Sequence, residues 1–130
     1  MKTADVIIVG SGASGLFNAL FLPQDYKVIV ITKKEVEESD SFLAQGGISA
    51  LKNPEDYDSY FEDTMKAGHY ENDKGAVEKM IKESPQIIQD LKDFGVRFDL
   101  KDGEIEFTRE GGPSTFRILH HEDLTGKEIT

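Results

Sequence analysis

DVIIVGSGASGL, at residues 5–16, joins a run of β-branched apolar residues to a glycine-rich turn. The apolar run at 5–9 is typical of a strand buried on both faces of a parallel sheet. Residues 13–22 predict a helix ended by Pro23, and residues 26–31 (YKVIVI) predict a second buried strand. Strand, turn, helix and strand form a βαβ unit, in which the strands are parallel and the crossover is right-handed.

The glycines of this turn have the G-x-G-x-x-G spacing of dinucleotide-binding loops. In such a loop the first glycine allows a tight turn, the second lets the backbone approach a pyrophosphate, and the third lets the helix pack on the strand. Free N–H groups and the helix dipole would hold the phosphates. The alternative is a glycine-rich turn without a ligand. The residues expected to bind a dinucleotide cofactor are Gly10, Ser11, Gly12, Ala13, Ser14 and Gly15.

The end of the second predicted strand lacks the acidic residue that usually holds the ribose hydroxyls. The sequence there is Thr32-Lys33-Lys34, and the first acid is Glu35. The threonine hydroxyl or a main-chain group can contact the ribose instead, and Lys33 can reach a phosphate or the adenosine ribose. The missing acid argues against a plain nicotinamide-dependent dehydrogenase, and more weakly against many FAD families.

Charge and composition restrict the class of function. A formal net charge of −10 argues against a nucleic-acid-binding face, which needs clustered Lys and Arg. No apolar run is long enough for a transmembrane helix, and the first residues lack the features of a signal peptide. The absence of cysteine excludes disulfides, thiolate metal sites and a cysteine nucleophile. We expect a globular cytoplasmic protein with no metal site.

Residues 54–95 predict a helical insertion that serves as scaffold. Asn53-Pro54 is typical of a helix start, with the asparagine as cap and the proline in the first turn. The apolar residues that follow recur at helical spacing on one face, which indicates core. Ser84-Pro85 is expected to end the second helix of this region and to cap a third.

Asp102-Gly103 predicts a β-hairpin between residues 97–100 and 105–108, because this dipeptide accepts the positive φ angles of a tight turn. Residues 109–113 (REGGP) then form an irregular loop. Residues 116–119 predict a further short strand.

The end of the chain predicts a helix, with Thr125 as its N-cap and Glu128 at its third position. The sequence stops two residues later. Only two long buried strands are present, and each needs neighbours on both sides. We interpret the chain as part of a larger protein, with open sheet edges that favour aggregation.

SFLAQGGI, at residues 41–48, is a narrower signal than the glycine turn. A-Q-G-G-I at this distance resembles the succinate dehydrogenase/fumarate reductase flavoproteins, in which the segment runs along the flavin of FAD. Adjacent glycines let a backbone lie close to a planar ring. Respiratory members attach FAD to a histidine five residues before this glutamine. That position is Asp40, so the resemblance implies non-covalent FAD. It also implies that the flavin is lined by Asp40, Ser41, Phe42, Leu43, Ala44, Gln45, Gly46 and Gly47.

Further segments resemble the L-aspartate oxidases of that family: Thr-Lys at residues 32–33, TREGG at 108–112 and RILH at 117–120. The resemblance implies oxidation of L-aspartate to iminoaspartate in de novo NAD biosynthesis. A hydride would pass from Cα to the flavin, with oxygen or fumarate as acceptor. Quinolinate synthase would be the downstream enzyme.

The resemblance also implies that Glu110 orients the amino group of the substrate. Aspartate carries an ammonium group that fumarate and succinate lack, and a carboxylate favours it by a charge-assisted hydrogen bond of about 1.5–3 kcal/mol. The alternative for Glu110 is a solvated loop residue. Arg109 can clamp a substrate carboxylate or serve the structure, and His120 and His121 can relay protons or be structural.

The expected fold is α/β, a partial Rossmann-like FAD/NAD(P)-binding domain with a βαβ unit, inserted helices and a β-hairpin. Residues 1–130 correspond to the N-terminal part of that domain, without the capping and C-terminal helical domains of the family, and are expected to be inactive alone. The alternatives are a fumarate reductase or succinate dehydrogenase-like subunit, a 3-ketosteroid dehydrogenase-like flavoprotein, and a non-catalytic FAD-binding fragment.

Overall fold

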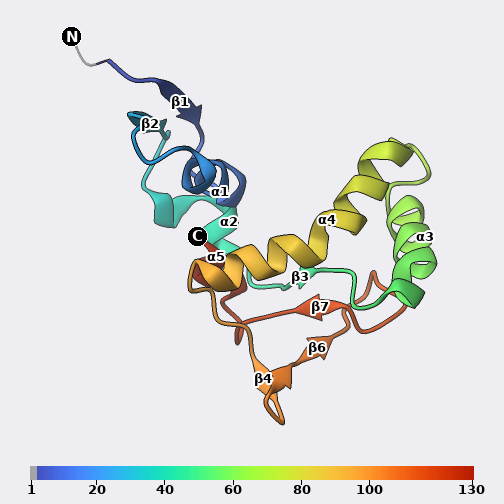
Figure 1. The fold of residues 1–130 in the computed structure, drawn as a ribbon. Helices are drawn as coiled ribbons and strands as arrows, with labels where there is room; N and C mark the ends of the chain where they lie inside the picture. The colour runs from blue at the N-terminus through green and yellow to red at the C-terminus, as the bar shows by residue number, and fades with distance from the viewer. Residues whose placement is uncertain (1–2) are drawn as a thin grey trace. The chain divides into compact units, whose positions relative to one another are not determined.

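The computed structural model describes residues 3–130, which form two compact units (Figure 1). One unit comprises the chain up to Gly46 together with Leu124–Thr130, and the other comprises Gly47–Asp123. No helix within residues 3–130 is both long and apolar enough to cross a membrane.

The first unit begins with the predicted βαβ unit, which is confirmed and gives an α/β fold. It consists of β1 (Val6–Val9), α1 (Ala13–Phe21) and β2 (Val28–Ile31). The two strands pair in parallel, with Val6 opposite Val28 and Val9 opposite Ile31. The helix ends one residue earlier than predicted, because Leu22 before the proline is extended.

The prediction that β1 and β2 are buried on both faces is wrong for the part of the chain that the structure describes. Ile7 is 60% exposed and Val9 is 82% exposed. Val6 and Ile8 are half-buried on the side where α1 approaches Ile8, whereas no helix or strand among residues 3–130 buries Ile7 and Val9. Apolar side chains on both faces of a strand are buried only where further strands and helices pack over them.

The stretch after β2 contains a 3-10 turn, η1 (Val36–Glu38), and a short helix, α2 (Asp40–Leu43). Ser39 caps α2, because its hydroxyl accepts a hydrogen bond from the backbone N–H of Phe42 at 3.2 Å. Residues 40–43, where no helix was predicted, therefore form a helical turn. The reason is a local serine cap, which satisfies one free N–H of that turn.

The last helix, α5 (Thr125–Ile129), packs against α2 in the same unit. The backbone N–H of Gly126 donates to the carbonyl of Ala44 at 2.9 Å, and a Cβ at Gly126 would collide with the carbonyls of Ser41 and Ala44. The prediction that Thr125 is the N-cap is wrong. Leu124 occupies the cap, and Thr125 is the first helical residue and is buried. The cause is the close approach of Gly126 to α2, which fixes where the helix begins.

The second unit contains a helical hairpin. The 3-10 turn η2 (Pro54–Asp56) leads into α3 (Tyr57–Ala67), and α4 (Lys74–Asp93) follows. The predicted cap is confirmed, because Asn53 Oδ1 accepts a hydrogen bond from the N–H of Asp56 at 3.0 Å. The two helices pack through a buried core formed by Tyr60, Met65, Val77 and Ile81.

The predicted helix break at Ser84-Pro85 is wrong, because α4 runs through Pro85 without interruption. Proline lacks the N–H that would bond to the carbonyl four residues earlier, which here belongs to Ile81. The Ser84 hydroxyl donates to that carbonyl at 2.7 Å and accepts from the N–H of Leu51 at 2.8 Å. The serine therefore satisfies the carbonyl that the proline leaves free, and the helix continues.

The predicted hairpin is confirmed as β4 (Leu100–Lys101) and β5 (Glu104–Ile105), with Asp102 and Gly103 at φ angles of 55° and 86°. Positive φ at both turn residues is the geometry that favours Asp-Gly in hairpins. The hairpin strands are shorter than predicted, because residues 107–108 pair elsewhere.

A second antiparallel sheet has the strand order β3, β7, β6. These strands are β3 (Ile48–Ser49), β6 (Phe107–Thr108) and β7 (Ile118–Leu119). Strand β7 lies within the strand predicted at residues 116–119, whereas no strand was predicted at β3. The pairs Phe107–Leu119 and Thr108–Ile118 join both ends of the intervening loop, residues 109–117.

Candidate functional site

The glycine turn of the first unit is tied to the end of β2. The N–H of Gly10 donates to the carbonyl of Ile31 at 2.8 Å, and Gly10 has a φ of 116°, which only glycine adopts readily. Ser11 is buried, and its hydroxyl lies 2.8 Å from the hydroxyl of Thr32. Because Thr32 donates to the carbonyl of Lys34, Ser11 is the donor in this pair. The threonine at the position of the missing acid therefore holds the turn.

The N-terminus of α1 suits an anion. Gly12 is the N-cap of this helix and has an extended backbone. No side chain caps the first N–H groups, and the first turn carries no acidic residue. The first N–H groups of a helix have no partner within the helix, so they are available to a phosphate. A Cβ at Gly15 would collide with the Gly10 carbonyl, and one at Gly12 would lie 3.0 Å from Ser41 Oγ. Residues 10–15 thus form a cradle that only this glycine spacing permits.

The other predicted cofactor residues of this unit lie mainly on its surface. Lys33 is exposed and has no ion pair or hydrogen bond with any of residues 3–130. Asp40 is the first residue of α2 and is exposed, as are Leu43, Ala44, Gln45 and Gly46, whereas Ser41 and Phe42 are half-buried. The Lys33 side chain and the exposed residues of and after α2 are therefore accessible to a cofactor.

Gly47 belongs to the second unit, and its lack of a side chain has a reason within that unit. A Cβ at Gly47 would collide with Ile118 Cγ2 and with the carbonyl of Leu119. The sequence indicated that the backbone at this glycine lies close to a flat ring. In the structure it lies close to β7. Pairing of Ile48 with Leu119 requires it.

Glu110 lies on the loop between β6 and β7, and its side chain is exposed. Among residues 3–130 it has no hydrogen-bond or ion-pair partner. Arg109 does not pair with it. Arg109 Nη1 donates instead to the carbonyl of Ser114 at 3.4 Å, and its guanidinium lies 5.7 Å from the centre of the Phe116 ring. The loop therefore presents an unpaired carboxylate, and the neighbouring arginine closes the loop.

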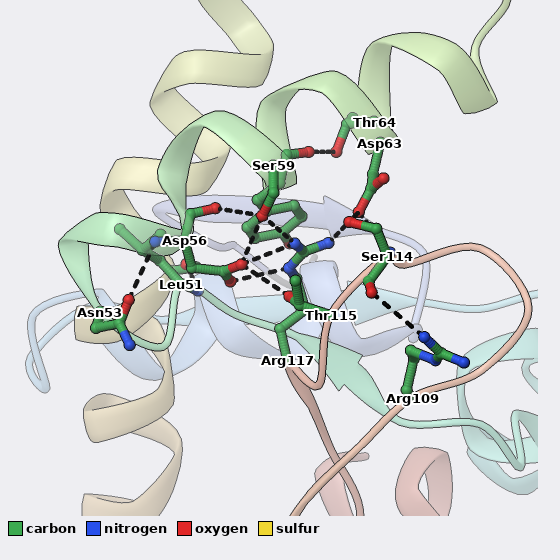
Figure 2. Close-up of polar contacts among 12 residues, drawn as sticks. Leu51, Asn53, Asp56, Ser59, Asp63, Thr64, Arg109, Ser114, Thr115 and Arg117 are labelled. Atoms are coloured by element: carbon green, nitrogen blue, oxygen red, sulfur yellow. Dashed lines mark hydrogen bonds and ion pairs between the residues drawn. The ribbon is translucent and has the colours of Figure 1, made fainter.

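A buried arginine beside this loop was not identified as a site residue from the sequence. Arg117 is fully buried, and Figure 2 shows its guanidinium between Asp56 and Asp63. Its Nε and Nη2 donate to the two oxygens of Asp56 at 2.9 and 2.8 Å, and its Nη1 donates to Asp63 Oδ2. Nη2 also donates to Ser59 Oγ at 2.7 Å, and the guanidinium lies 4.8 Å from the centre of the Tyr60 ring. The sequence signal that could have identified this cluster is the spacing of Asp56 and Asp63. These acids are about two helical turns apart and so lie on one side of the η2–α3 segment.

These contacts keep both carboxyls ionised. The hydrogen bond from Arg117 lowers the pKa of Asp56 to about 2 against the opposing effect of burial, and Ser59 and Thr115 contribute further. Burial raises the pKa of Asp63, but hydrogen bonds from Arg117 and Ser114 outweigh it and the pKa is lowered. The pKa of Arg117 is raised, mainly by its hydrogen bond to Asp56. The cluster is therefore fully charged at neutral pH.

The lowered pKa of Asp56 predicts a loss of stability in acid. A carboxyl whose pKa is depressed in the folded state adds stability above its ordinary pKa of 3.8, and this is lost as the pH falls toward 2. The difference corresponds to roughly 2 kcal/mol. Urea unfolding at steps from pH 6 down to pH 2.5 should show Asp56→Asn losing less free energy of unfolding than the unmodified protein. Equal losses in the two proteins would contradict the ion pair.

His120 and His121 share one carboxylate. Their Nδ1 atoms lie 3.1 and 3.4 Å from the two oxygens of Asp99, which also accepts a hydrogen bond from the N–H of Glu122 at 2.8 Å. The pair therefore contacts an acid of its own unit. No group of three His, Cys, Asp or Glu side chains among residues 3–130 is arranged to hold a metal ion.

Comparison with known proteins adds the identity of the family. The model of the FAD binding domain matches residues 5–130. The L-aspartate oxidase of Clostridium perfringens is 43% identical over 128 residues, which cover 98% of this chain and 29% of that enzyme. The L-aspartate oxidase of Clostridium acetobutylicum is 44% identical over 126 residues, covering 96% and 29%. The chain thus spans less than a third of the length of these relatives.

Two solved structures share the fold. Mycobacterium smegmatis Sdh1 in complex with UQ1 has a TM-score of 0.85 at 32% identity, covering 98% of this chain and 22% of that one. An E. coli quinol fumarate reductase FrdA variant has a TM-score of 0.87 at 27% identity, covering 97% and 22%. The anion cradle at residues 10–15 fits the pyrophosphate of FAD, which is the cofactor of the matched domain. The chain therefore belongs to the FAD-binding-domain family of the succinate dehydrogenase/fumarate reductase flavoproteins.

Proposed function

We propose that this protein oxidises L-aspartate to iminoaspartate with non-covalent FAD, as a step of de novo NAD biosynthesis. The observation that carries the proposal is the 43–44% identity, across nearly the whole chain, to enzymes named L-aspartate oxidase. The chain covers 29% of those enzymes, so the activity is proposed for the full gene product. Inactivity of residues 1–130 alone, a cytoplasmic location and quinolinate synthase as the downstream enzyme stay predictions.

Residues of the first unit are proposed to hold the cofactor. The N–H groups at the start of α1 bind the pyrophosphate at residues 10–15, where glycine leaves room for it. The ammonium of Lys33, which lies after β2 and has no partner among residues 3–130, neutralises charge at the adenosine end. Residues 40–47 lie along the flavin, with Asp40 where respiratory relatives carry the linking histidine. When bound, FAD accepts a hydride from the substrate Cα and is reoxidised by oxygen or fumarate.

Glu110 is proposed to bind the substrate ammonium group. Its carboxylate is exposed and has no competing partner among residues 3–130, so it is free to accept hydrogen bonds from a ligand. A hydrogen bond between charged groups is worth about 1.5–3 kcal/mol, which separates an amino acid from a plain dicarboxylate. The second candidate function is that of a fumarate reductase or succinate dehydrogenase-like subunit, which the TM-scores of 0.85 and 0.87 favour.

The test is flavin retention followed by reduction without oxygen. The full gene product is incubated with FAD, desalted, and examined by absorption spectroscopy before and after L-aspartate or succinate is added. We expect retained flavin that L-aspartate bleaches and succinate does not. Glu110→Gln should retain the same amount of flavin and be reduced by L-aspartate at least tenfold more slowly, the equivalent of about 1.4 kcal/mol. Glu71→Gln, the same change at an exposed glutamate of the second unit, should match the unmodified protein.

The outcomes separate the two candidates. Bleaching by succinate rather than L-aspartate would favour the fumarate reductase or succinate dehydrogenase-like reading. Failure of the full gene product to retain flavin would remove the basis of both. An unchanged rate for Glu110→Gln would show that this carboxylate does not bind the ammonium group.

A further inference from the structure

We propose that Arg117 is a positioning residue for Glu110. Its guanidinium fixes two aspartates of the η2–α3 segment, and these hold one arm of the loop that carries Glu110. The loop thereby places the carboxylate where a substrate ammonium group can meet it. This inference rests on the role proposed above for Glu110.

The tip of the loop has no packing of its own. Residues 109–117 connect β6 to β7, whose pairing fixes only the base of the loop. Glu110 is exposed, and a Cβ built on Gly111 or Gly112 meets nothing within 4 Å. The position of Glu110 must therefore be set by contacts elsewhere in the loop.

Those contacts lie on the arm that leads back to β7. Ser114 donates from both its N–H and its hydroxyl to Asp63 Oδ2, at 2.7 and 2.8 Å. Thr115 donates from its hydroxyl to Asp56 Oδ1 at 2.8 Å. Figure 2 shows both residues beside the aspartates that accept hydrogen bonds from Arg117. One buried guanidinium thus orients both acceptors of the loop.

The fixed arm is joined to the arm that carries Glu110. The side chain of Arg109, next to Glu110 in sequence, donates to the carbonyl of Ser114 and lies over the Phe116 ring. A chain of contacts therefore runs from Arg117 through Asp63 and Ser114 to Arg109. Holding a binding group near its working position avoids the entropy cost of ordering a loop when the substrate binds.

The geometry requires arginine at position 117. Three nitrogens of one planar group reach two carboxylates and a hydroxyl, which the single ammonium of lysine does not reproduce. A purely structural arginine would make the same contacts. A positioning role differs from a purely structural one in one respect. If Arg117 positions Glu110, then weakening the contacts that hold the loop must lower activity only where Glu110 is present.

Thr115→Val in the full gene product tests the inference with little change in shape. It removes the hydrogen bond to Asp56 and leaves the arginine pairs in place. We expect kcat/KM for L-aspartate to fall roughly 5- to 20-fold, which is less than for direct loss of a hydrogen bond to a charged group because Thr115 does not touch the substrate. The inhibition constant of succinate, which lacks an ammonium group, should change less than twofold. Thr64→Val is the matched control, because its hydroxyl donates to the carbonyl of Tyr60 within α3 and does not touch the loop.

The double variant of Thr115 and Glu110 distinguishes a positioning role from a purely structural one. In a Glu110→Gln background Thr115→Val should cause less than a twofold further loss, since residues that act together are not additive. Arg117→Lys should repeat the pattern with a larger loss. If Arg117→Lys does not fold, the threonine variant still decides.

Three outcomes would overturn the proposal. These are equal effects of Thr115→Val on aspartate and succinate, a full additional loss in the Glu110→Gln background, and an effect no larger than that of Thr64→Val. If Glu110→Gln alone leaves the discrimination between aspartate and succinate unchanged, the function proposed for Glu110 fails as well. If Glu110→Gln impairs aspartate oxidation but the losses add, only the positioning role fails.

Discussion

Arg117→Ala should lower the free energy of unfolding by about 3–5 kcal/mol, the usual cost of leaving a buried charge without its partner. The guanidinium is fully buried and pairs with Asp56 and Asp63. Its removal leaves two carboxylates side by side, without the hydrogen bonds that keep the pKa of Asp56 at about 2. It also leaves a cavity beside the Tyr60 ring, which adds to the loss.

Urea unfolding at pH 7 measures this loss, with Arg109→Ala as the matched control. Arg109 is exposed, and its side chain makes one long hydrogen bond and a ring contact, so its replacement should cost less than about 1 kcal/mol. Adding Asp56→Asn to Arg117→Ala should recover part of the stability, because one of the unpaired charges is removed. A cost for Arg117→Ala no larger than that of Arg109→Ala would show that the buried ion pairs do not support the fold.

The parts of the fold that sequence predicted are those with local causes. The glycine spacing at residues 10–15 predicted the turn, because the positive φ of Gly10 and the contact of Gly15 with Gly10 and Ile8 are local features. Asp102-Gly103 predicted the hairpin for the same reason, since positive φ at both positions is a property of the dipeptide. The cap at Asn53 was likewise visible in the sequence, because its acceptor and the N–H it binds are three residues apart.

The features that sequence missed depend on distant residues. Arg117 pairs with side chains 61 and 54 residues earlier, so nothing near it in the sequence indicates a buried charge. The Ser84 hydroxyl supports a helix through Pro85 partly because Leu51 donates to it from a distant segment. The reason for Gly47 is a strand more than 70 residues later, whose carbonyl and side chain leave no room for a Cβ. Propensity and spacing describe local chemistry, and tertiary contacts override them.

The same distinction between local and distant causes applies to the candidate site. The glycine turn at residues 10–15 was predicted, whereas the hydrogen bond between Ser11 and Thr32 that ties it to β2 was not, and the cofactor contacts of these residues stay predictions. Residues 109–113 were predicted as an irregular loop, as found, and Glu110 in this loop is exposed. What fixes the loop was not predicted, because its anchors Asp56 and Asp63 lie in a helical segment that the sequence marked as scaffold.

Gly15→Val should weaken FAD binding. Any Cβ at this position collides with the carbonyl of Gly10, and it lies 3.3 Å from Ile8 Cγ2. A valine must push α1 away from β1, which moves the N–H groups that we propose bind the phosphates. Overpacking of this kind costs about 1–3 kcal/mol, and most of it should fall on the bound state because that state needs the tight turn. We expect FAD to bind at least tenfold more weakly than to the unmodified protein.

Gly112→Val is the matched control, because a Cβ at that exposed loop position meets nothing within 4 Å. FAD per chain after desalting, and the dissociation constant from flavin fluorescence, should be unchanged in the control and altered in Gly15→Val. Circular dichroism of both variants shows whether the helices persist, so that loss of the cofactor can be told from loss of the fold. Equal FAD affinity in Gly15→Val and the unmodified protein would mean that the turn is not the pyrophosphate cradle. The phosphates would then have to be held by groups other than the N-terminus of α1, and the exposed Lys33 would be the next residue to replace.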